Sequence, residues 1–226
     1  MLLETPVDAR ARSLPDAALV ARVRAGEPEL FAVLMRRHNQ RLYRAARSIL
    51  RDEAEAEDVM QQAYVNAYRS LDQFAERASF ATWLTRIAVH EALARLRRRQ
   101  RFTGVDAMDE MEPESLHRGT EADPERLAQA AELRRLLEAA IDTLPTSYRC
   151  VFVLREVEGM STFETAECLS VSADVVKTRL VRARALLRKE LYTRTGHATA
   201  GAFTFYRPRC DRVVAAVCAR LGVAGA

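Results

Sequence analysis

The sequence predicts an all-α protein made of two small helical domains, a flexible acidic linker between them and a short C-terminal extension. Apolar residues recur at helical spacing along most of the chain, and strand-like alternation is absent from its first half. Glycine and proline are few, at 8 and 7 of 226 residues, which favours helices joined by short loops. The one long stretch without a period is acidic, and it separates two helical blocks.

The boundaries are placed where the pattern changes. We expect a first domain at 1–101, the linker at 102–126, a second domain at 127–192 and the extension at 193–226. The extension opens on a spacer, GHATAGAF. Further on, a short amphipathic helix is indicated by the spacing of Val213, Val214, Val217 and Leu221.

Four helices are expected in the first domain. The first begins at Pro15, a residue suited to the first turn of a helix, and Gly26 ends it. The second covers about 28–50 and the third about 53–71. A short loop, DQFAERAS, leads into a fourth helix that contains TWLTRIAVHEALARLRRRQR. This helix carries the only tryptophan of the chain at its start and a run of arginines at its end, a pairing that suggests a polyanion as its partner.

The second domain contains the pattern of a helix-turn-helix. Ser161 precedes a helical run and has Glu164 three residues later, which is a capping box, and Ser172 is the N-cap of the next helix. The connection at 169–171 has the short length that this motif needs. Four apolar residues of the second helix are expected to face inward: Val176, Leu180, Ala183 and Leu187.

Another face of this second helix lies near its N-terminus, where recognition helices present side chains to base edges in the major groove. The residues on it are Asp174, Lys177, Thr178, Val181 and Arg182. The candidate DNA-binding residues also include the N-cap Ser172 and Arg179, which lies around this face with Arg184, Arg188 and Lys189, where arginine and lysine are suited to neutralise phosphates. A solvated basic helix in an ordinary bundle is the alternative. The two caps, the short turn and the separate apolar stripe favour DNA binding.

The arginine-rich helix of the first domain offers a second DNA-binding surface. Trp83, His90 and Arg97 recur every seven residues and form a line about 21 Å long at about 1.5 Å per residue. That length corresponds to about six base steps of about 3.4 Å each. Aromatic rings and arginines together bind single strands, so this helix is suited to capturing unstacked bases. Two alternatives stay open: Trp83 as a core residue that pins the helix, and the arginines as a solvated helix end.

Several classes of function are excluded by composition. No apolar run is long enough to span a membrane and no signal pattern begins the chain, so we expect no membrane insertion and a cytoplasmic location. The histidines are scattered and no HExxH, GxSxG or glycine-rich phosphate loop occurs, so we expect no enzyme, no catalytic residue and no cofactor. We also expect no metal, since the spacing of His197, Cys210 and Cys218 matches no common zinc pattern.

The order of the motifs resembles a known family. The segments FAVLMRRHNQRLYRAARSILRD, EAEDVMQQAYVNAYRSLDQF and SFATWLTRIAVHEALARLRRR are similar to domain 2 of the extracytoplasmic-function (ECF, group 4) sigma factors of bacterial RNA polymerase. LPTSYRCVFVLREVEGMSTFETAECLSVSADVVKTRLVRARALLRKEL is similar to their domain 4. The resemblance is collinear over about 27–191 and implies a promoter-specificity factor with a linker in place of a full domain 3.

The resemblance also implies partners and residue roles. Asp58, Gln61 and Gln62 match the segment that docks on the clamp helices of the largest subunit of core RNA polymerase. The residues implied to bind the melted minus-ten element are Phe74, Ser79, Trp83, His90, Arg97, Arg98 and Arg101, with the loop 74–79 forming a pocket for a flipped base. The recognition face of the second domain is implied to read the minus-thirty-five element. The other implied partners are the polymerase flap and an anti-sigma factor, and the linker is expected either to follow polymerase channels or to be a solvated tether.

The sequence departs from the family pattern at a few positions. His90 stands where asparagine is usual and Ala94 where aspartate is usual, so the base preference at the position of His90 is open. Ser170 replaces the glycine expected in the helix-turn-helix bend, and Thr165 replaces an aliphatic core residue. A helix-turn-helix regulator that binds duplex DNA without polymerase is the alternative function, and it leaves the first domain without a role.

Overall fold

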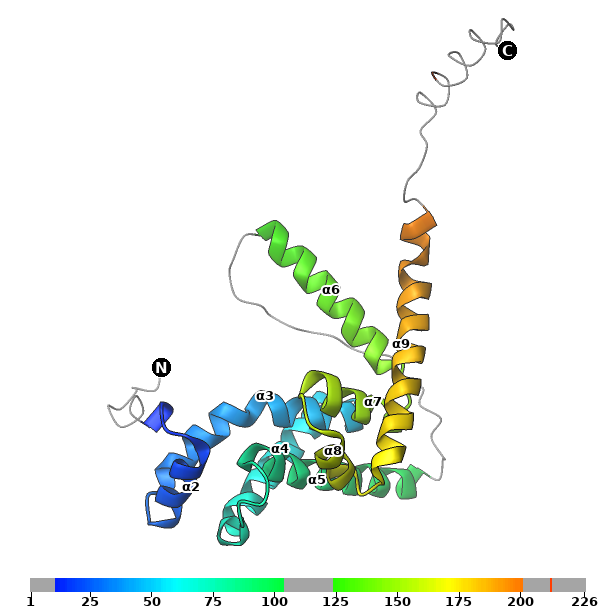
Figure 1. Ribbon diagram of the computed structural model, residues 1–226. Helices are drawn as coiled ribbons and strands as arrows, with labels where there is room; N and C mark the ends of the chain where they lie inside the picture. The colour runs from blue at the N-terminus through cyan, green and yellow to red at the C-terminus, as the bar shows by residue number, and fades with distance from the viewer. Residues whose placement is uncertain (1–10, 104–123, 201–211, 213–226) are drawn as a thin grey trace, which may run out of the picture. The chain divides into compact units, whose positions relative to one another are not determined.

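The computed structural model describes residues 11–103, 124–200 and 212, with side chains at 11–101, 131–194 and 212. All regular elements in this part of the chain are helical, which confirms the predicted all-α class (Figure 1). The first domain contains α2 (Asp16–Arg24), η1 (Pro28–Leu30), α3 (Phe31–Leu50), α4 (Glu53–Arg69), η2 (Leu71–Gln73) and α5 (Phe80–Thr103). The second contains α6 (Pro124–Asp142), α7 (Thr146–Phe152), η3 (Val153–Val157), α8 (Thr162–Leu169) and α9 (Ala173–Ala200). Most of the predicted linker, 104–123, and the predicted helix at 213–221 lie outside the described residues.

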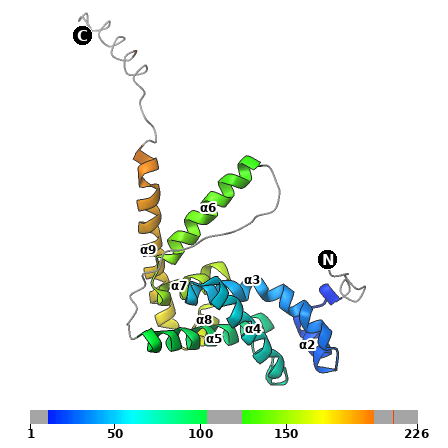
Figure 2. The ribbon, with the colours of Figure 1, turned by 180° about the vertical axis from the view of Figure 1, so that it is seen from behind.

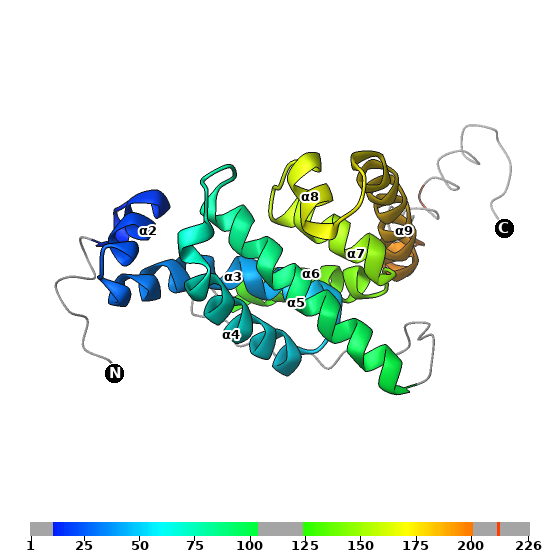
Figure 3. The ribbon, with the colours of Figure 1, turned by 90° about the horizontal axis from the view of Figure 1, so that it is seen from below.

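The first domain is a bundle of α3, α4 and α5 (Figures 1 and 3). Each helix turns one apolar face inward, as the spacing in the sequence predicts: α3 buries Leu34, Leu42 and Ile49. The short helix α2 packs against α3 with Leu19 and Val20 completely buried. Removing these faces from water supplies the main stabilisation of the bundle, at about 25 cal/mol per Å² of apolar surface.

Local chemistry fixes where these helices begin and end. Pro15 precedes α2, as expected from its preference for helix starts. Arg51 ends α3 in the left-handed conformation, with a φ of 60°. Asp52 follows as the N-cap of α4, and its carboxylate accepts a hydrogen bond from the N–H of Glu55 at 2.7 Å. The sharp turn from α3 into α4 therefore needs only two residues.

The second domain contains a π-turn that the helical pattern did not predict. α7 runs directly into η3, where the N–H of Glu158 donates to the carbonyl oxygen of Val153, five residues back, at 2.9 Å. Gly159 follows with a φ of 66°, a conformation that glycine adopts without a steric penalty. The π-turn and this glycine together reverse the chain towards α8.

From Lys189 onward the chain forms a separate unit, of which the structure describes the last part of α9 and Arg212. An ion pair between Arg194 and Glu190, one turn apart at 2.7 Å, stabilises this part of the helix. The predicted spacer GHATAGAF is wrong over its first residues, because α9 continues to Ala200. A single glycine inside a helix costs about 1 kcal/mol and does not by itself end it.

The hydrophobic residues form a core in the first domain, a core that both domains share and a smaller core in the second domain, which contains Val151, Ala166, Val176 and Leu180. Figure 2 shows the second domain from behind, with α7 beside α3. Buried side chains of α3, α4 and α5 meet Cys150, Leu154, Met160 and Cys168 in the shared core. The two domains that the sequence separates are thus in direct contact in this structure.

Candidate nucleic-acid interface

Two N-caps build the helix-turn-helix. The Ser161 Oγ atom accepts a hydrogen bond from the Glu164 N–H at 3.1 Å, and the Glu164 carboxylate accepts one from the Ser161 N–H at 2.8 Å. This is the predicted capping box, and it is confirmed. The predicted N-cap of the next helix is also present, since the Ser172 Oγ atom accepts from the Val175 N–H at 3.3 Å. The caps fix where α8 and α9 begin.

The turn between the two helices strains one residue. Ser170 ends α8 in the left-handed conformation, with a φ of 52°. The next N–H, that of Val171, donates to the carbonyl oxygen of Ala166 at 3.0 Å and closes the turn. A side chain at a left-handed position costs roughly 1 kcal/mol relative to glycine.

Replacing Ser170 with glycine is therefore expected to raise the free energy of unfolding by about 1 kcal/mol. Urea denaturation followed by circular dichroism measures the change. Ser147→Gly is the matched control, because Ser147 lies inside α7, where glycine is expected to lower stability by about 0.5–1 kcal/mol. Equal or reduced stability of Ser170→Gly would show that the turn is not strained at this residue.

The outer face of α9 carries the predicted recognition residues. The inward-facing stripe is confirmed, since Val176, Leu180, Ala183 and Leu187 are buried. Six candidates are exposed and Arg179 is half-buried; the exposed ones are Ser172, Asp174, Lys177, Thr178, Val181 and Arg182. Val181 is 66% exposed in the middle of this polar face. An apolar side chain in such a position is suited to contact with the methyl group of a thymine.

Tyr148 of α7 joins this face, although no motif in the sequence marks it. Its hydroxyl accepts a hydrogen bond from Nη1 of Arg182 at 3.4 Å. The two residues line a hollow of about 440 Å³ beside the start of α9, together with Asp174, Thr178 and Arg179. Only the fold brings α7 to the recognition helix, so no local signal in the sequence identifies Tyr148.

The aromatic residues at the start of α5 form a packed cluster. The Trp83 ring lies 5.2 Å from that of Phe74 and 5.7 Å from that of Phe80, between ring centroids. Phe74 is only 5% exposed, so the structure places this predicted minus-ten residue in the core rather than on the surface. Trp83 is half-buried, which combines packing against the core with an accessible ring edge. Ser79 is exposed, and its hydroxyl lies 2.9 Å from that of Thr82.

The arginines at the end of α5 divide into two groups. Arg95 pairs with Asp58 of α4 at 3.0 Å, and Arg99 pairs with Glu55 at 3.3 Å. The other arginines are exposed and form no ion pair with any residue that the structure describes; they are Arg97, Arg98 and Arg101. These three are the arginines predicted for the minus-ten element, and their charge is available to phosphates.

His90 is exposed on α5, between the aromatic cluster and the free arginines. Desolvation lowers its pKa below the usual 6.5, and the positive charges of Arg86 and Arg97 lower it further. The interaction with the backbone of Cys168 raises the pKa but does not cancel this shift. The ring is therefore mostly neutral at pH 7 and offers one donor and one acceptor.

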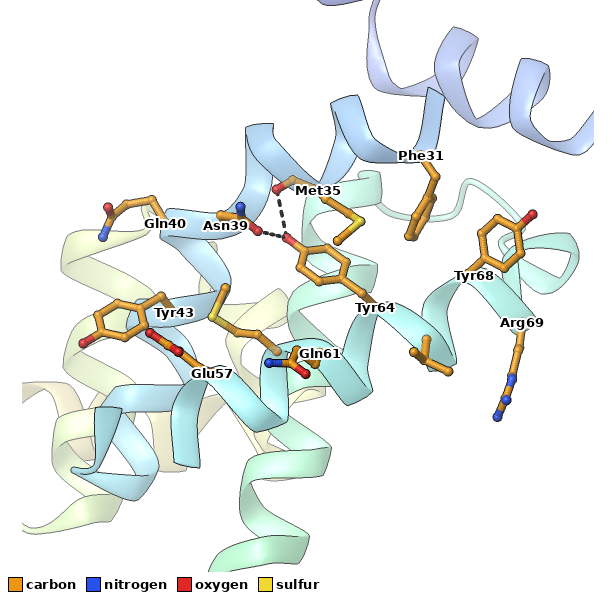
Figure 4. A pocket seen from close by; sticks show the side chains of 12 residues that line it. Phe31, Met35, Asn39, Gln40, Tyr43, Glu57, Gln61, Tyr64, Tyr68 and Arg69 are labelled. Atoms are coloured by element: carbon orange, nitrogen blue, oxygen red, sulfur yellow. Dashed lines mark hydrogen bonds between the residues drawn. The ribbon is translucent and has the colours of Figure 1, made fainter. Parts of the chain in front are cut away.

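The predicted polymerase-binding residues lie on the surface of α4. Asp58, Gln61 and Gln62 are all exposed. Gln61 also borders a groove of about 750 Å³ between α3 and α4, which no sequence pattern indicates (Figure 4). Apolar and aromatic side chains line most of this groove, among them Phe31, Met35, Met60, Tyr64 and Tyr68.

Two hydrogen bonds tie Tyr64 of α4 to α3 at the wall of the groove. The Tyr64 hydroxyl donates to the carbonyl oxygen of Met35 at 3.0 Å and lies 2.9 Å from the amide oxygen of Asn39. Burial raises the pKa of Tyr64, which keeps its hydroxyl protonated. Tyr68 and Val65 are 45% and 43% exposed, so this surface has an apolar area open to a partner.

The described residues hold no group of three or more histidine, cysteine or acidic side chains that fits a metal ion. Cys210 and Cys218 lie outside them, as does the side chain of His197. Cys150 and Cys168 are buried free thiols, and burial raises their pKa values to about 11 and about 12. Among the helices described, none is long and apolar enough to cross a membrane.

Comparison with protein families gives two matches in the order that the motifs predict. Residues 34–102 match Sigma-70 region 2, and residues 134–187 match Sigma-70, region 4. The ECF RNA polymerase sigma factor SigW of Bacillus subtilis (strain 168) is 32% identical over 176 residues, which cover 76% of this chain and 94% of the relative. The ECF RNA polymerase sigma-E factor of Escherichia coli (strain K12) is 32% identical over 178 residues, covering 77% and 93%.

Solved structures of similar fold are also available. CnrH in complex with the cytosolic domain of CnrY has a TM-score of 0.55 and 30% identity, over 79% of this chain and 97% of the other. The sigma factor RpoE in complex with the anti-sigma factor NepR from Bartonella quintana has a TM-score of 0.58 over 71% and 96% of the two chains. Its sequence identity with this chain is 21%, so the similarity shows the fold alone.

Proposed function

Because the chain belongs to the extracytoplasmic-function (ECF) sigma factors of RNA polymerase, which start transcription and are not enzymes, we propose that it reads promoters at two places. The second domain reads the duplex minus-thirty-five element and the first domain binds the melted minus-ten element. The observation that carries the proposal is the exposed recognition face of α9. N-caps fix the start of α8 and of α9, and α9 buries its apolar stripe on another side of the helix.

At the minus-thirty-five element, α9 enters the major groove with its N-terminal turns. Lys177 and Arg182 donate hydrogen bonds to base edges, and Val181 contacts a methyl group. Arg184 and Arg188 lie further along the exposed side of the helix and neutralise phosphates. In the free protein Lys177 pairs with Asp174 at 3.1 Å, a contact that is exposed and therefore weak enough to exchange for DNA.

At the minus-ten element, the exposed side of α5 tracks the separated strand. Arg97, Arg98 and Arg101 hold phosphates, and the accessible edge of Trp83 stacks near the upstream end of the opened region. Phe74 supports the pocket loop from beneath, since its ring is buried against Phe80 and Trp83.

The partner in initiation is core RNA polymerase. Asp58, Gln61 and Gln62 on α4 contact the clamp helices of its largest subunit, and the apolar groove between α3 and α4 accepts side chains from the same partner. The chain acts in the cytoplasm with the polymerase. An anti-sigma factor is a further partner, supported by the similar CnrH, which was solved in complex with the cytosolic domain of CnrY.

Transcription in vitro tests this function. Purified core polymerase together with the protein is expected to start transcripts at discrete promoters and to open the DNA around the start site, whereas core polymerase alone is not. A protein that binds duplex DNA by itself and never associates with core polymerase would instead be a helix-turn-helix regulator.

Replacing His90 with asparagine is expected to change base preference at one minus-ten position. The neutral ring presents one donor and one acceptor, and an asparagine amide presents them in another geometry. A hydrogen bond to a base is worth about 1–3 kcal/mol, so relative transcription from promoters that differ at this base should shift by about 5- to 150-fold. Transcription from a library of randomised minus-ten elements measures the shift, and an unchanged preference would assign His90 a structural role.

A further inference from the structure

The loop at 74–79, between η2 and α5, has a defined backbone although it contains no helix or strand. Its first residue, Phe74, is buried, and at its end the Ser79 Oγ atom accepts a hydrogen bond from the Thr82 N–H at 3.1 Å. Between them Glu76 is exposed and has a φ of 54°, in the left-handed region. A residue other than glycine keeps this conformation where the surrounding structure imposes it. The shape of the loop therefore depends on contacts with the rest of the first domain.

Arg24, the last residue of α2, supplies such a contact. Its Nη2 atom donates to the carbonyl oxygen of Phe74 at 2.7 Å, and its Nε atom donates to that of Leu71 at 3.1 Å. Nη2 donates to the Leu71 carbonyl oxygen as well. The guanidinium is a rigid planar fork, so it fixes the two carbonyl oxygens relative to each other. The backbone is thus held at the point where the loop begins.

The contact depends on direction more than on charge. The carboxylate of Asp72 lies 3.9 Å from Nε of Arg24, but its side chain is 91% exposed, so water screens the attraction. The two carbonyl oxygens belong instead to buried residues, Leu71 and Phe74, which are 4% and 5% exposed. A lysine in place of Arg24 would carry the same charge without the planar fork, and the two side chains are therefore not equivalent here.

α2 is itself fixed to α3, so the guanidinium at its end has a firm base. Leu19 and Val20 of α2 are completely buried in the core of the first domain. On the polar side of α2, the Asp16 carboxylate accepts a hydrogen bond from Arg37 and lies 2.8 Å from Nε2 of His38. The position of α2 is therefore passed on to the loop, which lies about 50 residues further along the chain.

We propose that Arg24 is a positioning residue for promoter recognition: it holds the backbone of the loop 74–79 in the shape that accepts a flipped base of the minus-ten element. The inference rests on the proposed minus-ten role of this loop. A preformed pocket binds its preferred base without an ordering cost, whereas a loose loop must be ordered as the base enters. A base that does not fit gains nothing from that order, so a loose loop narrows the difference between bases.

Limited proteolysis of the free, full-length chain tests the order of the loop. Arg77 is exposed in the loop, so trypsin cleavage after it reports how often the loop leaves its native shape. Arg24→Gln removes the planar fork and is expected to raise the initial rate of this cleavage about fivefold, the effect of one net hydrogen bond on an opening equilibrium. Arg22→Gln is the matched control on the same helix, because Arg22 donates to the nearby Glu27 carboxylate, and the rate should stay unchanged. Mass spectrometry of the first fragments measures the rates.

Transcription by core polymerase with the native chain or a variant tests base discrimination, on promoters randomised across the minus-ten element. The measured quantity is the ratio of transcript from the best base to transcript from the worst base at each position. For Arg24→Gln this ratio is expected to fall by about three- to tenfold at one position, from the cost of ordering the loop, and to stay unchanged at the others. Arg24→Lys should give an intermediate ratio, and it serves should Arg24→Gln fail to fold. Loss of folded protein lowers all transcripts alike and leaves every ratio unchanged.

An unchanged cleavage rate or unchanged ratios in Arg24→Gln overturn the proposal. An equal fall at every position also overturns it, as does a uniform loss of promoter affinity with a weaker dependence on salt, which would mean that Arg24 contacts a phosphate. Each of these results keeps the sigma function as long as the native chain starts transcripts at discrete promoters. Absence of such transcription by the native chain rejects the function itself, and the proteolysis still decides whether Arg24 holds the loop.

Discussion

Replacement of Arg149 with methionine is expected to lower the free energy of unfolding by about 1–3 kcal/mol, the range for leaving a buried hydrogen-bond acceptor unsatisfied. The guanidinium donates to the carbonyl oxygens of Ser48, Asp142 and Leu144 and to the Thr146 hydroxyl, at 2.6–3.2 Å. Methionine fills a similar volume and donates no hydrogen bond, so these buried acceptors are left unsatisfied. Urea denaturation followed by circular dichroism measures the loss.

Arg188→Met provides the control for this experiment. Arg188 is exposed on α9, and surface substitutions of this kind change stability by within about 0.5 kcal/mol. If the two variants unfold at the same urea concentration, Arg149 is not held in the buried network that links α7 to α3.

Lys177→Ala and Arg182→Ala are each expected to reduce promoter-directed transcription by about 5- to 150-fold. The range follows from about 1–3 kcal/mol for a specific contact with a base. Both side chains are exposed, and neither contributes to the buried stripe of α9, so folding should be unaffected. Start-site selection on a defined promoter and the affinity for core polymerase should both be measured.

The two readouts separate the proposed surfaces. Variants of Lys177 and Arg182 should retain core binding, whereas replacing Asp58 and Gln61 on α4 should weaken core binding and leave contact with duplex DNA intact. Equal effects of both pairs on both readouts would contradict the division of roles between α9 and α4.

Local features of the helix-turn-helix could be predicted from the sequence. The capping box at Ser161 and the N-cap at Ser172 are present because a short polar side chain before a helix satisfies free N–H groups within three residues. The left-handed conformation of Ser170 is likewise a local property, imposed by a turn that must close within three residues.

Contacts between distant segments could not be predicted in the same way. Phe74 lies in a polar loop, and it is buried because the fold places it in the core of the first domain with residues of α2, α3 and α4. Likewise, the apolar spacing of α7 indicates an inward face without saying which domain covers it. The groove between α3 and α4 is also invisible in the sequence, because its lining residues read as core residues of either helix.

The burial of Cys168 has a kinetic consequence. Its Sγ atom lies 4.0 Å from the carbonyl oxygen of Thr82, between the two domains, and the raised pKa of the thiol keeps it protonated. A thiol reagent reaches this sulfur only after the surrounding structure opens. With Cys210 and Cys218 replaced by serine, the labelling half-life of Cys168 therefore measures how often the structure around it opens. The labelling half-life of Cys150 on α7 provides a second measurement of such opening.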